Sequence, residues 1–305
     1  MHSQRRPSDE LPKGILDDRE LPDDSFDSLW DSIIVEPELK GRLLSQSLLN
    51  FTLRSKVDRA RVPLHGVILL VGPPGTGKTS LARGLASKTA KVLNAKAGFH
   101  YLEVEPHGLA SQSLGRSQQA VKHLLGSVIA ERAANGPLIV VLDEVETLAA
   151  DRKKMSMEAN PVDVHRATDA VLAQLDQLAT MYPELLFIAT SNFTGAIDEA
   201  FLSRADLIVN VDVPGPEACH WILKDTLSEL ATKFPQLQKL IEDPKIKRAA
   251  ERCSGLDGRR IRKAVISALT WDKETAVDPS KLTAEHVLRA VDDAKSAIAL
   301  KEKNS

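Results

Sequence analysis

The chain has 305 residues, 43% of them hydrophobic, which is enough apolar sequence for one large domain or a medium and a small one. Its 40 basic and 42 acidic side chains give a formal net charge of −2, which excludes a strong overall attraction to nucleic acid or to acidic membranes. The two cysteines lack C-x-x-C spacing, so we predict no disulfide framework. We also find no apolar run of membrane-spanning length and no signal-peptide pattern, so we predict a cytoplasmic protein.

In chain order, residues 1–25 are charged and contain three prolines, so we predict a flexible N-terminal arm. Residues 26–214 are predicted to form an α/β domain, because five short apolar runs there alternate with stretches of helical periodicity. Such runs are typical of a five-stranded parallel sheet with helices on both faces. The runs are residues 66–72, 101–105, 138–144, 184–192 and 206–213. Residues 215–305 are predicted to form a small all-helical domain, and Trp30 and Trp221 to lie in cores.

A glycine-rich motif, GPPGTGKT, lies between the first apolar run and a helical stretch, and it fits G-x-x-x-x-G-K-[ST]. Backbone N–H groups of such a loop bind phosphates, the lysine reaches the β- and γ-phosphates, and the threonine hydroxyl binds Mg²⁺. The alternative is a glycine turn that only joins a strand to a helix. The predicted nucleotide-binding residues are Gly72, Pro73, Pro74, Gly75, Thr76, Gly77, Lys78, Thr79 and Ser80.

Two later runs end in polar residues that suit the same site. Asp143 and Glu144 follow the third run, where Asp143 would bind Mg²⁺ and Glu144 would activate the attacking water. Asn192 ends the fourth run, where its amide would orient that water. Taken alone, the two carboxylates could instead cap a helix, and the asparagine could form a turn.

These motifs, together with LDEVETL, VLAQLDQL, TSNFTGAIDEAFLSRADL and SGLDGRRIRK, resemble the AAA+ ATPases between about Phe26 and Ala264. Within that family the chain resembles the pachytene-checkpoint class, which remodels HORMA-domain proteins. The resemblance implies a P-loop AAA+ domain with a helical lid, and ATP and Mg²⁺ as cofactors. It makes Lys78 and Thr79 the Walker A pair, Asp143 and Glu144 the Walker B pair, and Asn192 the sensor 1 residue.

The resemblance also gives roles to two arginines. Arg204 falls at the arginine-finger position, which completes the catalytic site of a neighbouring subunit, and Arg259 falls at the sensor 2 position of the lid. Without the family, Arg204 would be read as a surface ion pair with Asp206. Arg259 would belong to a solvated helix face or to a nucleic-acid patch, and the neutral overall charge disfavours the patch.

A finger that acts on a neighbour requires subunits that meet in a ring, and the resemblance implies a homohexamer around a polypeptide pore. The pore loop is expected at residues 106–119, where Leu109 and Leu114 stand in place of the aromatic residues that relatives carry. The compact form is similar to bacterial remodellers that act on a HORMA-domain protein and, through it, on a signalling nucleotidyltransferase in antiviral defence. Two alternatives stay open: an unfoldase or loader for a protease or nucleic-acid machine, and a nucleotide-gated binding ring. Direct contact with a membrane or with nucleic acid is not expected.

Overall fold

The computed structural model describes residues 11–94, 98–105, 116–149, 161–193, 195 and 197–303. The predicted pore residues Leu109 and Leu114 lie outside this set. The described residues divide into two compact units. The first comprises those within 1–30, 38–71 and 79–210, and the second those within 31–37, 72–78 and 211–305. The phosphate-loop segment therefore groups with the helical end of the chain.

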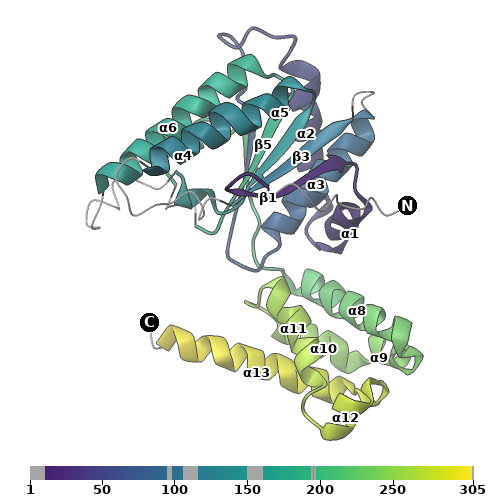
Figure 1. Cartoon of the computed structure of the whole chain (residues 1–305). Coiled ribbons are helices and arrows are strands. Elements are labelled where there is room, and N and C mark those ends of the chain that lie inside the picture. The colour runs from purple at the N-terminus through teal and green to yellow at the C-terminus, as the bar shows by residue number, and fades with distance from the viewer. Residues whose placement is uncertain are drawn as a thin grey trace. The chain divides into compact units, whose positions relative to one another are not determined.

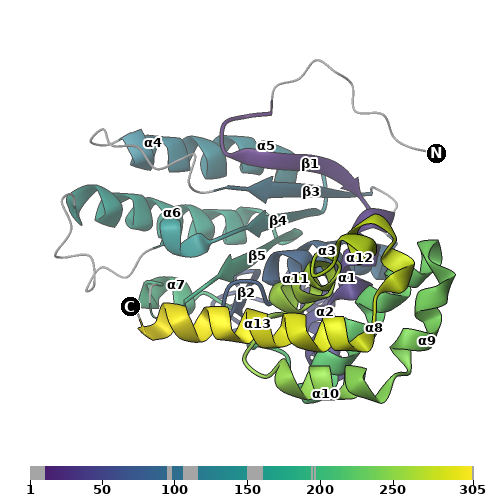
Figure 2. The ribbon, with the colours of Figure 1, turned by 90° about the horizontal axis from the view of Figure 1, so that it is seen from below.

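The first unit is built on a six-stranded sheet with the order β1-β3-β4-β5-β2-β6. Figure 1 labels β1, β3 and β5, and Figure 2 also labels β4 and β2. The last five strands in the chain are parallel, in agreement with the five apolar runs of the sequence. Every residue of β2, β4 and β5 is buried, which explains why these strands are apolar over most of their length. The strands are β1 (Ile15–Leu21), β2 (Val67–Val71), β3 (Phe99–Val104), β4 (Leu138–Leu142), β5 (Leu185–Ser191) and β6 (Leu207–Asn210).

The prediction of a flexible arm over residues 1–25 is wrong for Ile15–Leu21, which forms β1 and pairs antiparallel with β3. Its sequence, ILDDREL, lacks a clean alternation, so it does not read as a strand. Its charged side chains are paired at the sheet edge. Asp17 pairs with Arg19, and Asp18 pairs with Arg132 at 2.6 Å. Charged side chains are common on edge strands.

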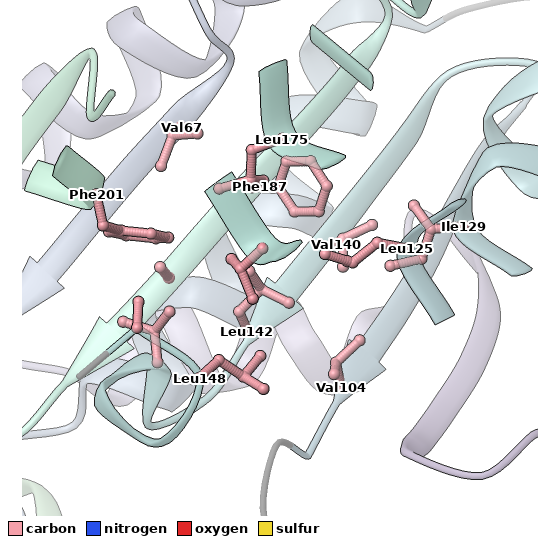
Figure 3. Close-up of a cluster of buried hydrophobic side chains, with 14 of the residues drawn as sticks. Val67, Val104, Leu125, Ile129, Val140, Leu142, Leu148, Leu175, Phe187 and Phe201 are labelled. Atoms are coloured by element: carbon pink, nitrogen blue, oxygen red, sulfur yellow. The ribbon is translucent and has the colours of Figure 1, made fainter. Parts of the chain in front are cut away.

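Helices cover both faces of this sheet, with α4 and α6 on one side and α2 and α3 on the other (Figures 1 and 2). A cluster of buried side chains joins β2, β4 and β5 to α6 and to a π-helical turn at Leu124–Ile129 (Figure 3). Phe187, Leu175 and Val140 lie near its centre. The helices of this part are α1 (Asp24–Ser32), α2 (Pro37–Leu53), α3 (Lys78–Leu93), α4 (Arg116–His123), α5 (Ala130–Ala134), α6 (Pro161–Met181) and α7 (Glu199–Leu202).

The second unit is helical from residue 216 onward, as predicted, and has its own apolar core, which includes both cysteines. Trp30 of α1 is buried as expected, but the prediction for Trp221 is wrong, since 54% of this residue is exposed on α8. Among the described residues, no helix has the length and apolarity needed to cross a bilayer. The helices are α8 (Pro216–Lys233), α9 (Gln238–Ile241), α10 (Pro244–Arg252), α11 (Gly258–Ala268), α12 (Lys273–Val277) and α13 (Ala284–Lys303).

Candidate nucleotide and catalytic site

The glycine-rich loop follows β2 directly and ends where α3 begins, at Lys78. Gly72 and Gly75 have φ angles of 150° and 85°, which residues with a side chain rarely adopt. A Cβ on Gly72 would lie 2.2 Å from the backbone oxygen of Val211, and one on Gly75 would lie 2.4 Å from Oδ1 of Asp257. The loop conformation therefore requires glycine at both positions.

Lys78 is buried, and its ammonium lies against the carbonyls of the loop. Its Nζ donates to the backbone oxygens of Gly72 at 2.8 Å and Pro73 at 2.9 Å. Thr76 also donates to the oxygen of Pro73, at 3.0 Å. A positive charge beside the N-terminus of a helix forms a site suited to an anion such as a phosphate. A plain turn between strand and helix would not need a buried ammonium.

Thr79, the second residue of α3, meets the end of β4. Its hydroxyl donates to Oδ1 of Asp143 at 2.7 Å, and the hydroxyl of Thr190 on β5 donates to the same oxygen at 2.5 Å. Mg²⁺ prefers hard oxygen ligands, and it is usually held by one or two carboxylates together with waters and substrate phosphates. Thr79 and Asp143 fit such a site. The described residues contain no cluster of three or more His, Cys, Asp or Glu that would form a complete protein cage.

Glu144 and Asn192 are also brought together. Asn192 Nδ2 donates to Oε1 of Glu144 at 3.0 Å, and the N–H of Glu144 donates to the Thr190 hydroxyl at 3.1 Å. Glu144 has φ 52° and ψ 53°, a left-handed conformation that costs a non-glycine residue free energy and is often found at functional sites. Its side chain makes no capping bond to the turn that follows, so the helix-cap alternative does not describe it.

Two residues of this cluster were not predicted from the sequence. Thr190 contacts both Asp143 and Glu144, and Glu146 Oε1 accepts from the backbone N–H of Asn192 at 3.0 Å. The signal for Thr190 is its place at the buried end of a strand, two residues before Asn192. Glu146 is the third carboxylate of LDEVETL. The Walker B motif gives roles only to the first two, Asp143 and Glu144.

Arg204, just after α7, forms a two-point ion pair with Asp176 of α6. Its Nε lies 3.0 Å from Oδ1, its Nη2 lies 2.6 Å from Oδ2, and its Nη1 donates to the oxygen of Ala200 at 2.6 Å. The alternative pairing with Asp206 is wrong. The carboxylate of Asp206 instead accepts from the N–H groups of residues 65–67 at the start of β2.

Other charged groups surround the Asp176 carboxylate. Arg59 Nη2 lies 3.4 Å and His65 Nε2 lies 3.6 Å from its Oδ1. Burial acts to raise the pKa of Asp176, but Arg204, His65 and Arg59 outweigh it, so the pKa is below its ordinary value. Burial, reinforced by the charge of Arg59, lowers the pKa of His65. The carboxylate of Asp176 is therefore ionised at neutral pH.

Arg204 is not brought to the cluster of Glu144 and Asn192. Asp206, two residues later, donates its N–H to the oxygen of Val67, at the amino end of β2. Thr79, Asp143 and Asn192 follow the carboxyl ends of their strands. The two edges are separated by the five residues of β2, or about 16 Å. An arginine side chain cannot span that distance within one subunit.

Arg259 is exposed in the first turn of α11, and its backbone N–H donates to the oxygen of Gly75 at 3.3 Å. Asp257 caps this helix by accepting from the N–H of Arg260 at 2.9 Å. Arg260 also pairs with Asp257, and Arg262 pairs with Asp225. Because these charges are matched, the nucleic-acid patch is disfavoured. The solvated helix face stays a valid description of the Arg259 side chain.

Sequence comparisons find a family and several relatives. Residues 68–213 match the family "ATPase family associated with various cellular activities (AAA)". The chain is 58% identical over 285 residues to "CD-NTase-associated protein 6" of Pseudomonas aeruginosa, covering 93% of each chain. It is 35% identical over 276 residues to "Pachytene checkpoint protein 2 homolog" of Arabidopsis thaliana, covering 80% of this chain and 59% of that relative. The chain thus spans about three-fifths of the plant protein.

Solved structures with the same fold are also found. The PCH-2 structure of C. elegans has a TM-score of 0.74 and 26% identity, covering 95% of this chain and 78% of that one. A chain in the "E. coli MS115-1 HORMA:CdnC:Trip13 complex" also has a TM-score of 0.74, with 18% identity, covering 91% of this chain and 94% of that one. At that identity the second match concerns the fold alone.

Proposed function

The chain belongs to the AAA ATPase family, in the group that includes CD-NTase-associated protein 6, and from this we propose that it is an ATP-driven ring motor that remodels a HORMA-domain protein. The observation that carries the ATPase part is the pair of contacts at the carboxyl ends of β4 and β5. Thr79 meets Asp143, and Asn192 meets Glu144. The oxygen atoms of Thr79 and Asp143 are suited to bind Mg²⁺, and the side chains of Glu144 and Asn192 are suited to bind a water molecule.

Each residue has a distinct part in the proposed hydrolysis of ATP. The loop N–H groups and Lys78 bind the phosphates, and Thr79 and Asp143 hold Mg²⁺. The metal, when bound, supplies positive charge to the β- and γ-phosphate oxygens. Glu144 accepts the proton of the attacking water, and Asn192 fixes the orientation of Glu144 and of that water. Arg259 acts as the sensor 2 residue of the lid, residues 215–305.

Arg204 acts on a neighbouring subunit. Its separation from Glu144 by a strand length supports this role, because the guanidinium cannot reach the catalytic cluster of its own chain. Asp176 holds the Arg204 side chain in a defined position within its own subunit. A homohexameric ring provides the required neighbour for every subunit.

The proposed client is a HORMA-domain protein, and through it the ring acts on a signalling nucleotidyltransferase and switches the pathway off in the cytoplasm. Two findings support this client. The relative that is 58% identical is named for association with a CD-NTase. A chain of the same fold is part of a complex with HORMA and CdnC components. Leu109 and Leu114 remain the predicted client-contacting residues.

A trapping experiment tests the client. The Glu144→Gln variant should bind ATP without hydrolysing it, so client should stay on the ring when ATP and Mg²⁺ are present. Tagged protein is recovered from a lysate of its own cells, and bound proteins are identified by mass spectrometry. Lys78→Ala, which should not bind ATP, is the matched control.

We expect a HORMA-domain protein on Glu144→Gln with ATP, and none with ADP or on Lys78→Ala. A protease or nucleic acid recovered in its place would support the unfoldase or loader alternative. Binding that needs ATP, with no change in the client's conformation when wild-type protein hydrolyses it, would support the nucleotide-gated ring.

A further inference from the structure

The third carboxylate of LDEVETL, Glu146, lies in the short 3₁₀ turn Val145–Thr147 that follows Glu144. Its Oε1 accepts from the backbone N–H of Asn192 at 3.0 Å. This bond joins the segment after β4 to the segment after β5. The two segments that supply the catalytic pair are therefore tied to each other by a side chain that is not itself part of the pair.

The bond to Glu146 fixes the backbone from which the Asn192 amide extends. That amide donates to Oε1 of Glu144 at 3.0 Å. An asparagine side chain is short, so a small shift of its backbone moves the amide out of hydrogen-bond reach of Glu144. Catalytic groups must be held within a fraction of an ångström, and this depends on the residues that support them.

The second carboxylate oxygen of Glu146 indicates that this residue is not there simply to fill space. Oε2 is buried, and no group in the described part of the chain hydrogen-bonds it. A buried oxygen without a partner costs free energy, which an apolar side chain at the same place would avoid. In contrast, the neighbouring Val145 is fully buried in the core. The contact with Asn192 is the compensating interaction that Glu146 makes.

We propose that Glu146 is a positioning residue for ATP hydrolysis, which holds Asn192 in place so that its amide can orient Glu144 and the attacking water. This inference rests on the proposed ATPase function. Glu146 does not touch the reacting atoms. It acts through its hydrogen bond with the Asn192 backbone, and the acceptor oxygen matters rather than the negative charge.

Three substitutions separate the hydrogen bond from the charge. Glu146→Gln keeps an acceptor oxygen at the same reach and removes the charge, so it should retain most of the wild-type kcat. Glu146→Asp keeps the charge but is one methylene shorter, and Glu146→Ala removes both, so these two should lower kcat by at least about tenfold. KM and the affinity for ATP should stay within about twofold of wild type, because the phosphate-binding loop is untouched.

The control is Glu184→Ala, a matched substitution of an exposed glutamate that precedes β5 at its opposite end. It should leave kcat unchanged. A cycle with Asn192→Ala completes the test, because Glu146→Ala should add little to the loss caused by Asn192→Ala alone. Independent, additive losses would contradict the proposal.

The results distinguish two failures. If the wild-type ring does not hydrolyse ATP, the proposed function itself is wrong. If it does, but Glu146→Ala keeps the wild-type kcat, or Glu146→Gln falls as far as Glu146→Ala, the positioning role is wrong. If Glu146→Ala does not fold, the comparison of Gln with Asp still decides, since the proposal requires Gln to be the more active.

Discussion

At the scale of single residues, Thr190 links the two halves of the catalytic cluster, because its hydroxyl donates to Asp143 and accepts from the N–H of Glu144. Thr190→Val keeps the shape of this fully buried side chain and removes the hydroxyl. We expect kcat to fall by about tenfold or more, because the Glu144 backbone loses its partner. Steady-state ATPase assays measure this, and Thr190→Ser should restore most of the rate. A Val variant as active as wild type would contradict the role.

His65 predicts how stability changes with pH. Its pKa is lowered in the folded chain by burial and by Arg59, whereas an unfolded histidine titrates near pH 6.5. The unfolded chain therefore binds more protons in the window just below pH 6.5, and stability should fall as the pH drops through it. In His65→Gln, the loss of unfolding free energy between pH 7.5 and 5.5 should be smaller, as measured by urea denaturation. An unchanged loss would mean that other groups cause the effect.

These residues also show where sequence reasoning ends. The roles of the phosphate-loop and catalytic residues could be predicted because each occupies a fixed place in a short motif beside a buried strand. These residues are Lys78, Thr79, Asp143, Glu144 and Asn192. The partner of Arg204 could not, because Asp176 lies 28 positions earlier in the chain and the contact exists only after α6 and α7 pack. Glu146 and Thr190 were within the quoted motifs, but their hydrogen bonds depend on the register of two strands.

At the scale of elements, a charge pair between the partly exposed Arg83 and the buried Glu103 connects α3 to β3. Arg83 donates to Glu103 from Nε at 2.8 Å and from Nη2 at 2.6 Å, and the Tyr101 hydroxyl donates to the same carboxylate at 2.7 Å. The carboxylate raises the pKa of Arg83, and burial together with Glu103 raises the pKa of Tyr101. Glu103 is almost completely buried. The helix that starts at the phosphate loop is thus attached to the strand through charges.

Removing one partner of the Arg83–Glu103 pair should lower the free energy of unfolding. Arg83→Ala leaves the Glu103 carboxylate buried without its counter-ion, and we expect a loss of about 3 kcal/mol in the free energy of unfolding. The double variant Arg83→Ala/Glu103→Gln should recover most of it, because the isolated charge is gone. Arg132→Ala is the control, since its pair with Asp18 is more exposed, and it should cost less than about 1 kcal/mol. Equal losses in Arg83→Ala and the double variant would contradict this account.

The elements that could be predicted are those whose sequence reflects complete burial. Three of the five parallel strands, β2, β4 and β5, are apolar over most of their length because both of their faces are buried. The strand β6 is recognisable from its alternation of buried and exposed residues. β1 was missed because its central residues are charged, and their partners include Arg132, more than a hundred residues away. Its pairing with β3 is a tertiary interaction that no local pattern indicates.

At the scale of the whole molecule, the position of Arg204 predicts complementation between inactive subunits. Arg204→Ala removes the finger, and Glu144→Gln removes the base, so each variant alone should hydrolyse little ATP. In mixed rings, an Arg204→Ala subunit can receive the intact finger of a Glu144→Gln neighbour. At equal proportions we expect recovery to about a quarter of the wild-type rate, since one interface type in four is complete.

The measurement is the ATPase rate as a function of the mixing ratio, after subunit exchange. Activity that stays at the level of the separate variants at every ratio would contradict a finger that acts between subunits. A further control mixes Glu144→Gln with Asn192→Ala. Glu144 and Asn192 both act in the catalytic cluster of their own subunit. A neighbouring subunit cannot supply the missing side chain of either variant, so no recovery is expected.

The charged edge strand β1 also affects the tendency of the protein to aggregate at high concentration. By pairing with β3, it covers backbone N–H and C=O groups of a largely buried strand, and it presents its own Asp and Arg side chains at the rim. Such an edge is a poor template for intermolecular β-pairing. Shortening the chain past Leu21 would uncover β3 and create an aggregation-prone edge, whereas trimming before Pro12 leaves the strand complete.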